Sequence, residues 1–312
     1  MRNPLWKPLR SLLHCRLWLT FFLAMAFVPA LYAQSEPVRV IAFGAHPDDC
    51  DLGAGGLAAK YAALGDKVKF VSLTNGDAGH QSQGGKELAD RRRAEAKEAG
   101  RRIGIEYEVL DNHDGKLLPT LDVREQVIRE IRQWKADIVI APRPNDYHPD
   151  HRYTGVLVQD ASYMVIVPNL VKDTPPLPRN PVFLYYSDHF TRPQPFQPDI
   201  VVSIDDVFEK KIDMLDAHVS QVYEWLPWTT GTLDQVPKDA VARKKWLATQ
   251  ERALRSALPN GRNHWRSAMA PKRLTSSTSR RSRLPNMDVS PPRRRSISSF
   301  HFSPTTSLSL EP

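Results

Sequence analysis

The sequence predicts an α/β protein with a mostly parallel β-sheet and helices on both faces of that sheet. The first observation behind this fold class is that short β-branched runs alternate with helical patterns between residues 38 and 141. The second is composition: of 312 residues, 41% are hydrophobic and 25% are charged, which argues against wholesale disorder and against a multi-span membrane protein. The two cysteines are too few for a disulfide scaffold or a Cys-rich zinc module.

Four strands and three helices are expected in the first half of the chain. The strands are short buried runs, two of the helices close on a glycine, and the third carries an apolar stripe. In chain order these elements are strand 38–43, helix 57–64, strand 67–73, helix 87–103, strand 106–110, helix 123–134 and strand 137–141. In folds of this class, ligands bind at the carboxyl ends of the strands.

The pattern weakens after Thr154. Residues 182–186 and 200–204 are predicted to form later strands. Asp205 is the predicted N-cap of a helix that extends to about Tyr223.

Residues 1–33 have the pattern of a secretory signal peptide. Basic residues precede an uncharged run, residues 17–33, which contains Pro29 and ends with the small residue Ala33. We therefore expect cleavage near Ala33 and a protein exported to the periplasm or the extracellular space. An uncleaved N-terminal membrane anchor is the alternative, because the run approaches the length that spans a bilayer.

The formal net charge of +8 is concentrated in residues 260–312, which hold ten Lys and Arg residues and two acidic residues. The rest of the chain carries no net formal charge. This Ser/Pro/Arg-rich tail has no apolar periodicity and is predicted to be disordered, with polyanion binding as the alternative. No nucleic-acid partner is expected, and the globular domain is predicted to cover residues 34–259.

Two His-Pro-Asp segments follow the first and fourth predicted strands. Each carries two metal-binding side chains three residues apart, His46 with Asp49 and His148 with His151, and this spacing places both members of a pair on one side of a helical turn. Two such turns facing each other would offer imidazole nitrogen and carboxylate oxygen to one divalent ion. Three protein ligands with an open water position form the pattern of catalytic zinc. The alternative is that these residues cap helices and form turns.

Five motifs occupy the stretch from Val38 to Gln221, and they are, in order, AHPDDCDLGAGG, TNGDAGH, RRAEAKEAGRRIG, DGKL and HPDH. Their order and spacing resemble those of the PIG-L/LmbE-like family of zinc-dependent N-deacetylases. The resemblance implies a Rossmann-like fold and removal of the acetyl group from an N-acetylglucosamine-type sugar or conjugate. It also implies that His46, Asp49 and His151 bind zinc, although iron or another divalent ion suits the same ligand types.

The resemblance further implies the roles of four other residues. Asp48 would be the general base that activates water, and His148 the partner of the oxyanion or the acid. Asp146 would orient His148, and Arg92 matches a family arginine near the substrate. The expected ligand is a small N-acetylated amino sugar or glycoconjugate, and a membrane is expected as a partner only through an uncleaved leader.

Three features keep alternatives open. The family often has Glu where this chain has Asp51, and residues 260–312 do not resemble the usual end of the family, so a catalytically impaired sugar- or metal-binding protein is the alternative function. The glycines after Asp51 do not match the dinucleotide fingerprint, which argues against a nucleotide-dependent enzyme. Trp225 and Trp228 flank Pro227 and are expected to pack in the core, with stacking on a sugar ring as the alternative.

Overall fold

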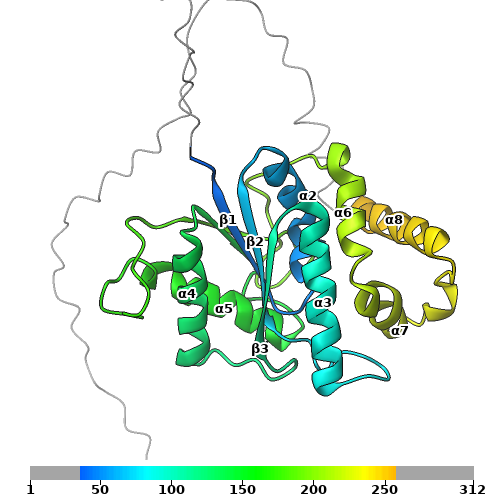
Figure 1. The fold of residues 1–312 in the computed structure, drawn as a ribbon, viewed down its shortest axis with the longest axis horizontal. Coiled ribbons are helices and arrows are strands. Elements are labelled where there is room, and N and C mark those ends of the chain that lie inside the picture. Colours follow the sequence, from blue (N-terminus) through cyan, green and yellow to red (C-terminus); the bar gives the residue numbers. More distant parts are fainter. Residues whose placement is uncertain (1–35, 258–312) are drawn as a thin grey trace, which may run out of the picture. The chain divides into compact units, whose positions relative to one another are not determined.

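A computed structural model describes residues 36–257, in which helices cover both faces of a five-stranded parallel sheet (Figure 1). The strands are β1 (Arg39–Gly44), β2 (Lys67–Thr74), β3 (Glu106–Asn112), β4 (Ile138–Ala141) and β5 (Val182–Tyr185). The α-helices are α2 (Asp49–Ala63), α3 (Gly85–Ile103), α4 (Leu121–Trp134), α5 (Pro149–Met164), α6 (Phe208–Leu215), α7 (Leu226–Thr229) and α8 (Ala240–Ala257). The predicted signal peptide and basic tail lie outside the described residues, so both stay predictions.

The strand order β3-β2-β1-β4-β5 confirms the predicted α/β class and the Rossmann-like arrangement. All four strand pairs are parallel; Ala42 of β1, for example, lies opposite Phe70 of β2 and Ile140 of β4. The order reverses between β1 and β4, and the helices that follow these two strands, α2 and α5, pack on opposite faces of the sheet. Folds of this class bind ligands in the crevice that such a reversal creates.

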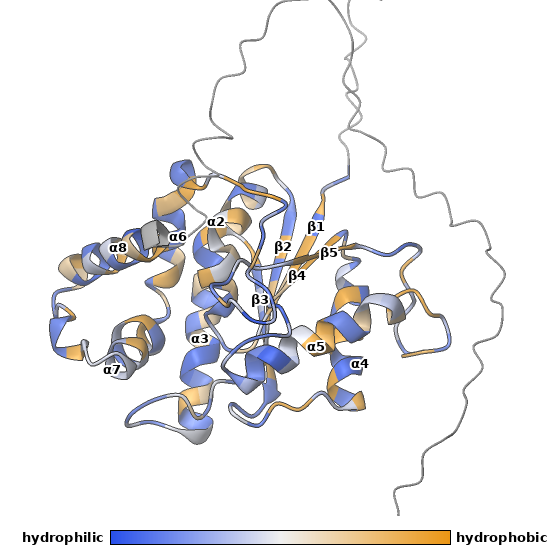
Figure 2. Cartoon of the chain, turned by 180° about the vertical axis from the view of Figure 1, so that it is seen from behind, coloured by the Kyte–Doolittle hydropathy of each residue, from blue (hydrophilic) through white to orange (hydrophobic). Residues whose placement is uncertain are grey.

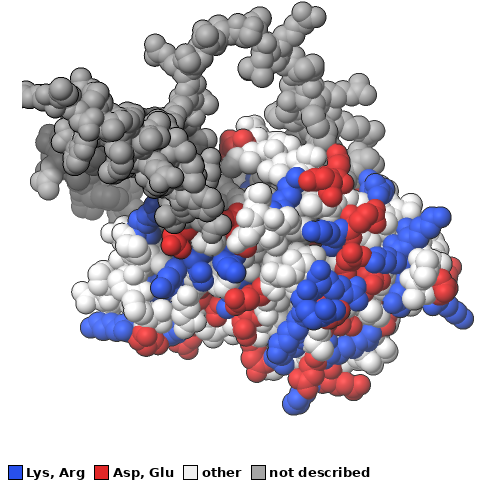
Figure 3. Space-filling view, turned by 45° about the horizontal axis from the view of Figure 1, so that its top comes forward, with Lys and Arg blue, Asp and Glu red and all other residues white. Residues whose placement is uncertain are grey.

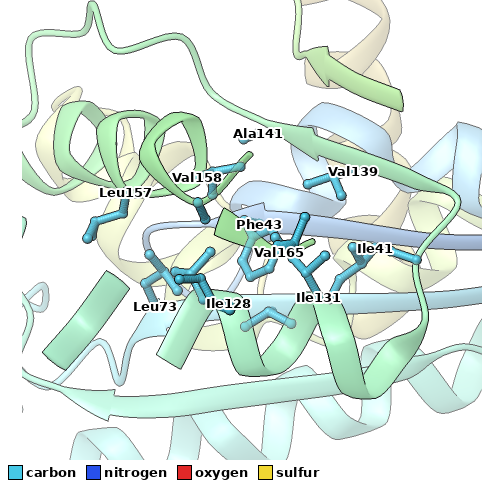
Figure 4. Packing of buried hydrophobic residues seen from close by; sticks show 14 of the residues in the cluster. Ile41, Phe43, Leu73, Ile128, Ile131, Val139, Ala141, Leu157, Val158 and Val165 are labelled. Carbon is cyan, nitrogen blue, oxygen red and sulfur yellow. The ribbon is translucent and has the colours of Figure 1, made fainter. Parts of the chain in front are cut away.

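Alternate residues of β1 contribute to the two faces of the sheet. Ile41 and Phe43 pack against side chains of α4 and α5, as Figure 4 shows, whereas Val40 and Ala42 pack on the face covered by α2, α3 and α6. The central strands β1 and β4 are buried on both faces and hydrophobic along most of their length, and Figure 2 shows orange on them, whereas the edge strand β3 is blue because it carries Glu106 and Glu108 at exposed positions.

A buried arginine ties α4 to the end of α5. Arg132 is 2% exposed, and its guanidinium donates to six backbone carbonyls, those of Met164, Val165, Val167, Leu170, Val171 and Thr174. These carbonyls lie at or beyond the C-terminal end of α5, where a helix leaves its last carbonyl groups without intrahelical partners.

Replacing Arg132 by Met is expected to lower the free energy of unfolding by about 3–5 kcal/mol, because several buried carbonyls lose a charged donor. The matched control is Arg129→Met, one turn earlier on α4. Arg129 makes ion pairs with Asp173 and Glu125 at the surface, where solvent screens them, so their loss is expected to change stability little. Chemical denaturation monitored by circular dichroism measures both changes. Equal losses for the two variants would show that Arg132 has no special part in stability.

Two predictions for the second half of the chain are wrong. Residues 200–204 form no strand; Ile200 is 64% exposed, and Ile204 packs against α2 at Gly56. A β-branched run pairs only where packing on a sheet favours it, and these side chains have no such surface.

The helix predicted to run from Asp205 to about Tyr223 is interrupted. A 3₁₀ turn (Asp205–Val207) leads into α6, and a π-helical segment (Ser220–Trp225) follows after a break. At the break the fully buried His218 turns inward, and its Nε2 lies 3.0 Å from Oδ1 of Asp51 on α2. This tertiary contact accounts for the end of the regular helix.

The described surface carries charges of both signs. On the face shown in Figure 3, Lys and Arg side chains are interspersed with Asp and Glu side chains. None of the helices between residues 36 and 257 is both long and apolar enough to cross a bilayer.

Candidate metal centre and active site

The two predicted His-Pro-Asp segments meet at the point where the strand order reverses. The first leaves β1 and enters α2, so that His46 lies in the turn and Asp49 opens the helix. The second follows β4, where His148 is the N-cap of α5 and Pro149 is the first helical residue. Each segment therefore holds its side chains at a strand-to-helix turn, and the parallel pairing of β1 with β4 brings the turns together.

Three donor atoms from these turns lie at nearly equal distances from one another. Nδ1 of His46 is 3.2 Å from Nε2 of His151 and 3.6 Å from Oδ2 of Asp49, and the last two atoms are 3.5 Å apart. Ligands at the usual bond lengths of a tetrahedral zinc ion are separated by about 3.3 Å. The structure thus brings together the three predicted ligands, and this donor set fits one divalent ion.

The other nitrogen of His46 contacts two carboxylates that the sequence analysis did not single out. Nε2 of His46 lies 3.2 Å from Oδ1 of Asp114 and 3.3 Å from Oδ2 of Asp150, and both side chains are buried. Oδ2 of Asp150 also accepts the backbone N–H of Gly115 at 2.7 Å. Carboxylates in this position orient an imidazole and leave its other nitrogen free for a metal.

Two groups of three side chains place one donor atom each within 4.8 Å of the others: His46 with His148 and His151, and His46 with Asp114 and Asp150. Burial would lower the pKa of His46, but hydrogen bonds to Asp114, Asp150 and Asp49 raise it well above its usual value. The surrounding carboxylates therefore favour positive charge at this position, and a cation bound beside Nδ1 would benefit from the same interaction.

Asp48 has an unusual backbone conformation, and its pKa is shifted in the opposite direction from that of its neighbour Asp49. Its backbone φ of 153° lies in a strained region for a residue other than glycine, and such strain often accompanies an active site. Burial and the adjacent Asp49 raise the pKa of Asp48 to about 7. Burial also opposes ionisation of Asp49, but the charge of His151 and hydrogen bonds with His46 outweigh it and lower the pKa of Asp49.

His148 stands beside the two histidine ligands with a different hydrogen-bond pattern. Its ring centroid lies 4.8 Å from that of His46 and 5.0 Å from that of His151. Burial and these two neighbours lower its pKa, and Nδ1 accepts the backbone N–H of Asp150 at 3.2 Å. A neutral ring that accepts at Nδ1 carries its proton on Nε2, so His148 presents an N–H donor at the site.

Asp146 contacts both histidines of its segment. Oδ1 of Asp146 accepts the backbone N–H of His148 at 2.9 Å, but its contact with a ring is with His151, whose Nδ1 lies 3.1 Å from Oδ2. Asp146 therefore holds the backbone of His148 and orients the ring of His151. This is the carboxylate–histidine pairing that commonly supports a zinc ligand.

Replacing Asp146 by Asn is expected to weaken metal binding by about 10- to 100-fold, because His151 loses the carboxylate that fixes its ring. Competition against a chromogenic chelator measures the affinity. Asp173→Asn is the control, since Asp173 pairs with Arg129 away from the site. Unchanged metal affinity with a reduced kcat would instead support the original prediction, in which Asp146 acts through His148.

Arg92 lies beneath the site and is 1% exposed. Its guanidinium donates to the backbone carbonyls of Gly76 and Gly79 and, at 2.5 Å, to Oε1 of Gln221, while Nη1 lies 3.7 Å from Oδ2 of Asp114. Arg92 thus connects the loop after β2 with Asp114, which contacts His46. The substrate-binding role of Arg92 stays a prediction.

A cavity of about 150 Å³ opens beside the candidate metal ligands. Its walls include Asp49, His151 and Tyr186, together with Arg143, which makes a two-pronged ion pair with Asp188 at 2.6 Å for each contact. The cavity lies on the β4 and β5 side of the centre, and two of the three candidate ligands, Asp49 and His151, line it.

Comparisons with known proteins find relatives over the part of the chain that contains this site. Residues 41–162, which contain both His-Pro-Asp turns, match the sequence profile of the PIG-L family, described as GlcNAc-PI de-N-acetylase. Diacetylchitobiose deacetylase of Thermococcus kodakarensis is 32% identical over 203 residues, which cover 61% of this chain and 73% of that protein. A probable N-acetyl-alpha-D-glucosaminyl L-malate deacetylase 2 of Bacillus cereus is 29% identical over 221 residues, which cover 66% of this chain and 92% of that protein.

A solved structure shares the fold. N,N'-diacetylchitobiose deacetylase from Pyrococcus horikoshii, in complex with its inhibitor MPG, superposes with a TM-score of 0.56 at 29% identity. The match covers 64% of this chain and 78% of that chain. All three of these proteins are named as deacetylases.

Proposed function

This chain belongs to the PIG-L family, and from that membership we propose that it removes the acetyl group from the amine of an N-acetylglucosamine-type sugar or glycoconjugate. It is a hydrolase that acts on carbon–nitrogen bonds other than peptide bonds. We further propose that the reaction depends on one divalent ion, and that this ion is zinc. The observation that carries the proposal is the triangle of donor atoms on His46, Asp49 and His151.

The proposed reaction breaks the amide bond between the acetyl carbon and the sugar nitrogen. When bound, the ion would supply the Lewis acidity that makes water acidic enough to deprotonate near neutrality and that polarises the acetyl carbonyl. Asp48 accepts a proton from the attacking water, for which its buried carboxylate lies next to the ligand Asp49. A nearby cation favours the ionised form of Asp48, which is the form that accepts a proton.

His148 acts on the carbonyl oxygen. Its Nε2–H donates a hydrogen bond to the oxygen as negative charge develops there, and a donor of this kind contributes about 10²- to 10³-fold to the rate. The nitrogen then leaves with a proton returned by Asp48 or given by His148. The products are acetate and the free amine.

The proposal is tested with purified protein loaded with zinc and offered N-acetylglucosamine, N,N'-diacetylchitobiose and an N-acetylated lysine peptide. Release of primary amine is expected from the sugars and not from the peptide. Activity is expected to disappear on treatment with a chelator and to return when zinc is added. Turnover that persists after complete metal removal, or that is confined to the peptide, would contradict the proposal.

A further inference from the structure

Two tryptophans beside the site are not part of the core. Trp225 ends the π-helical segment and Trp228 lies in α7; their rings are stacked with centroids 5.2 Å apart and planes 16° apart. Trp228 is 50% exposed, so the expectation that it packs in the core is wrong. Leaving half of an indole exposed gives up much of the stabilisation that its burial would provide. The stacked pair of Trp225 and Trp228, called the platform below, therefore presents an aromatic surface to solvent.

A short series of contacts joins this platform to the candidate metal centre. Nε1 of Trp225 would lie 3.4 Å from a Cβ atom at Gly79, and the backbone N–H of Gly79 donates to Oδ2 of Asp114 at 3.0 Å. Oδ1 of Asp114 in turn lies 3.2 Å from Nε2 of His46. Two residues therefore separate the indole from a metal ligand. Ala78 in the same loop is exposed and Gly79 is partly exposed, whereas Asp114 is buried beneath them.

Ion pairs hold the segment of the platform against the same loop. Glu224, next to Trp225, accepts two hydrogen bonds from the guanidinium of Arg91 at 2.8 and 2.7 Å, and its Oε2 lies 2.9 Å from Nε2 of His80. The platform is therefore fixed in place before any ligand arrives. Within the described residues, the indole N–H of Trp225 has no hydrogen-bond acceptor, so it remains available to a ligand hydroxyl.

We propose that Trp225 and Trp228 form a second sugar subsite, which binds the pyranose ring adjacent to the ring whose acetamide is cleaved. The C–H face of a pyranose is apolar and complements the electron-rich face of an indole, while the free N–H supplies a polar contact at the ring edge. This inference rests on the proposed function and adds to it a preference for disaccharides and longer glycoconjugates over a single N-acetylated sugar. Figure 1 shows α7 on the same side of the sheet as α3 and α6.

The test compares N-acetylglucosamine with N,N'-diacetylchitobiose as substrates of the wild-type protein and of Trp228→Ala. The variant is expected to lose about tenfold in kcat/KM on the disaccharide, through KM, and to change little on the monosaccharide. Trp228→Phe keeps an aromatic face and is expected to recover most of the loss. Tyr163→Ala is the control, because Tyr163 is an exposed aromatic residue near the far end of α5.

A binding measurement separates this inference from the proposed function. Calorimetric titration with chitobiose and with glucosamine, which have no acetyl group to lose, is expected to show the same selective loss in Trp228→Ala. If Trp228→Ala lost chitobiose binding selectively but the wild-type protein deacetylated no substrate, the proposed function would be refuted and the subsite would still be supported. Equal effects of Trp228→Ala on the monosaccharide and the disaccharide, or no effect on either, would overturn the subsite.

Discussion

Replacing Asp48 by Asn is expected to lower kcat by about 10²- to 10⁴-fold while one equivalent of metal stays bound. Asn has nearly the shape of Asp but cannot accept the proton of the attacking water. The carboxylate of Asp48 accepts no hydrogen bond from the described residues, so its removal leaves the donor atoms of His46, Asp49 and His151 in place.

The adjacent residue provides the matched comparison. Asp49→Asn makes the same chemical change one position along the chain, but there it removes a carboxylate that lies 3.5 Å from Nε2 of His151. We expect this variant to lose both metal and activity. Metal content by atomic emission and amine release on the same samples test the pair. If Asp48→Asn lost its metal, or kept its rate, the assignment of Asp48 as the base would be wrong.

The three clustered histidines are expected to respond differently to alanine. His46→Ala and His151→Ala should weaken metal binding by more than about 100-fold, because removing a ligand costs more than removing the partner that orients it. His148→Ala should keep the metal and lose about 10²- to 10³-fold in kcat, since it removes a donor to the carbonyl oxygen. Equilibrium dialysis against zinc, followed by the amine-release assay, separates the two outcomes.

A fourth histidine serves as the control in this series. His113 is exposed in the loop after β3, where its Nδ1 contacts Asp77, and His113→Ala should change neither metal binding nor turnover. If His148→Ala lost as much metal as His151→Ala, His148 would be a ligand. The role assigned to it at the carbonyl oxygen would then have to be withdrawn.

The central strands β1 and β4 could be predicted from the sequence because strands buried on both faces of a parallel sheet are continuous apolar runs. The start of α2 could not. It begins at Asp49, eight residues before the predicted start, and its first turns contain glycines with poor helix propensity. These glycines are required by packing: a Cβ at Gly53 would approach Tyr186 to 2.9 Å, and one at Gly56 would approach Ile204 to 2.6 Å. Such close approaches depend on residues far along the chain.

The same limit applies to the site. His46, Asp49 and His151 could be singled out because two spaced pairs follow two strands of one sheet, and the order of those strands brings the pairs together. Asp114 lies in the short DGKL motif, where a single acidic residue in a turn resembles a helix cap or a turn former. Its contact with His46 exists only because the loop after β3 packs beside β1 and β4 at the carboxyl edge.

The hydrogen-bond partner of Asp146 depends on local geometry that the sequence does not show. The family resemblance pairs Asp146 with His148, two residues away, whereas His151 is five residues away. In the structure the first turn of α5 brings the ring of His151 back over Asp146, while His148 turns its Nδ1 to the backbone N–H of Asp150. The geometry of the first turn of α5 therefore determines that the Asp146 carboxylate contacts the ring of His151.

X-ray diffraction from crystals of the zinc-loaded protein, with data collected on both sides of the zinc absorption edge, tests the metal centre most directly. The expected result is one anomalous peak about 2.0–2.2 Å from Nδ1 of His46, Oδ2 of Asp49 and Nε2 of His151. A peak on the opposite side of the His46 ring, between Nε2 and the carboxylates of Asp114 and Asp150, would contradict this assignment of the ligands.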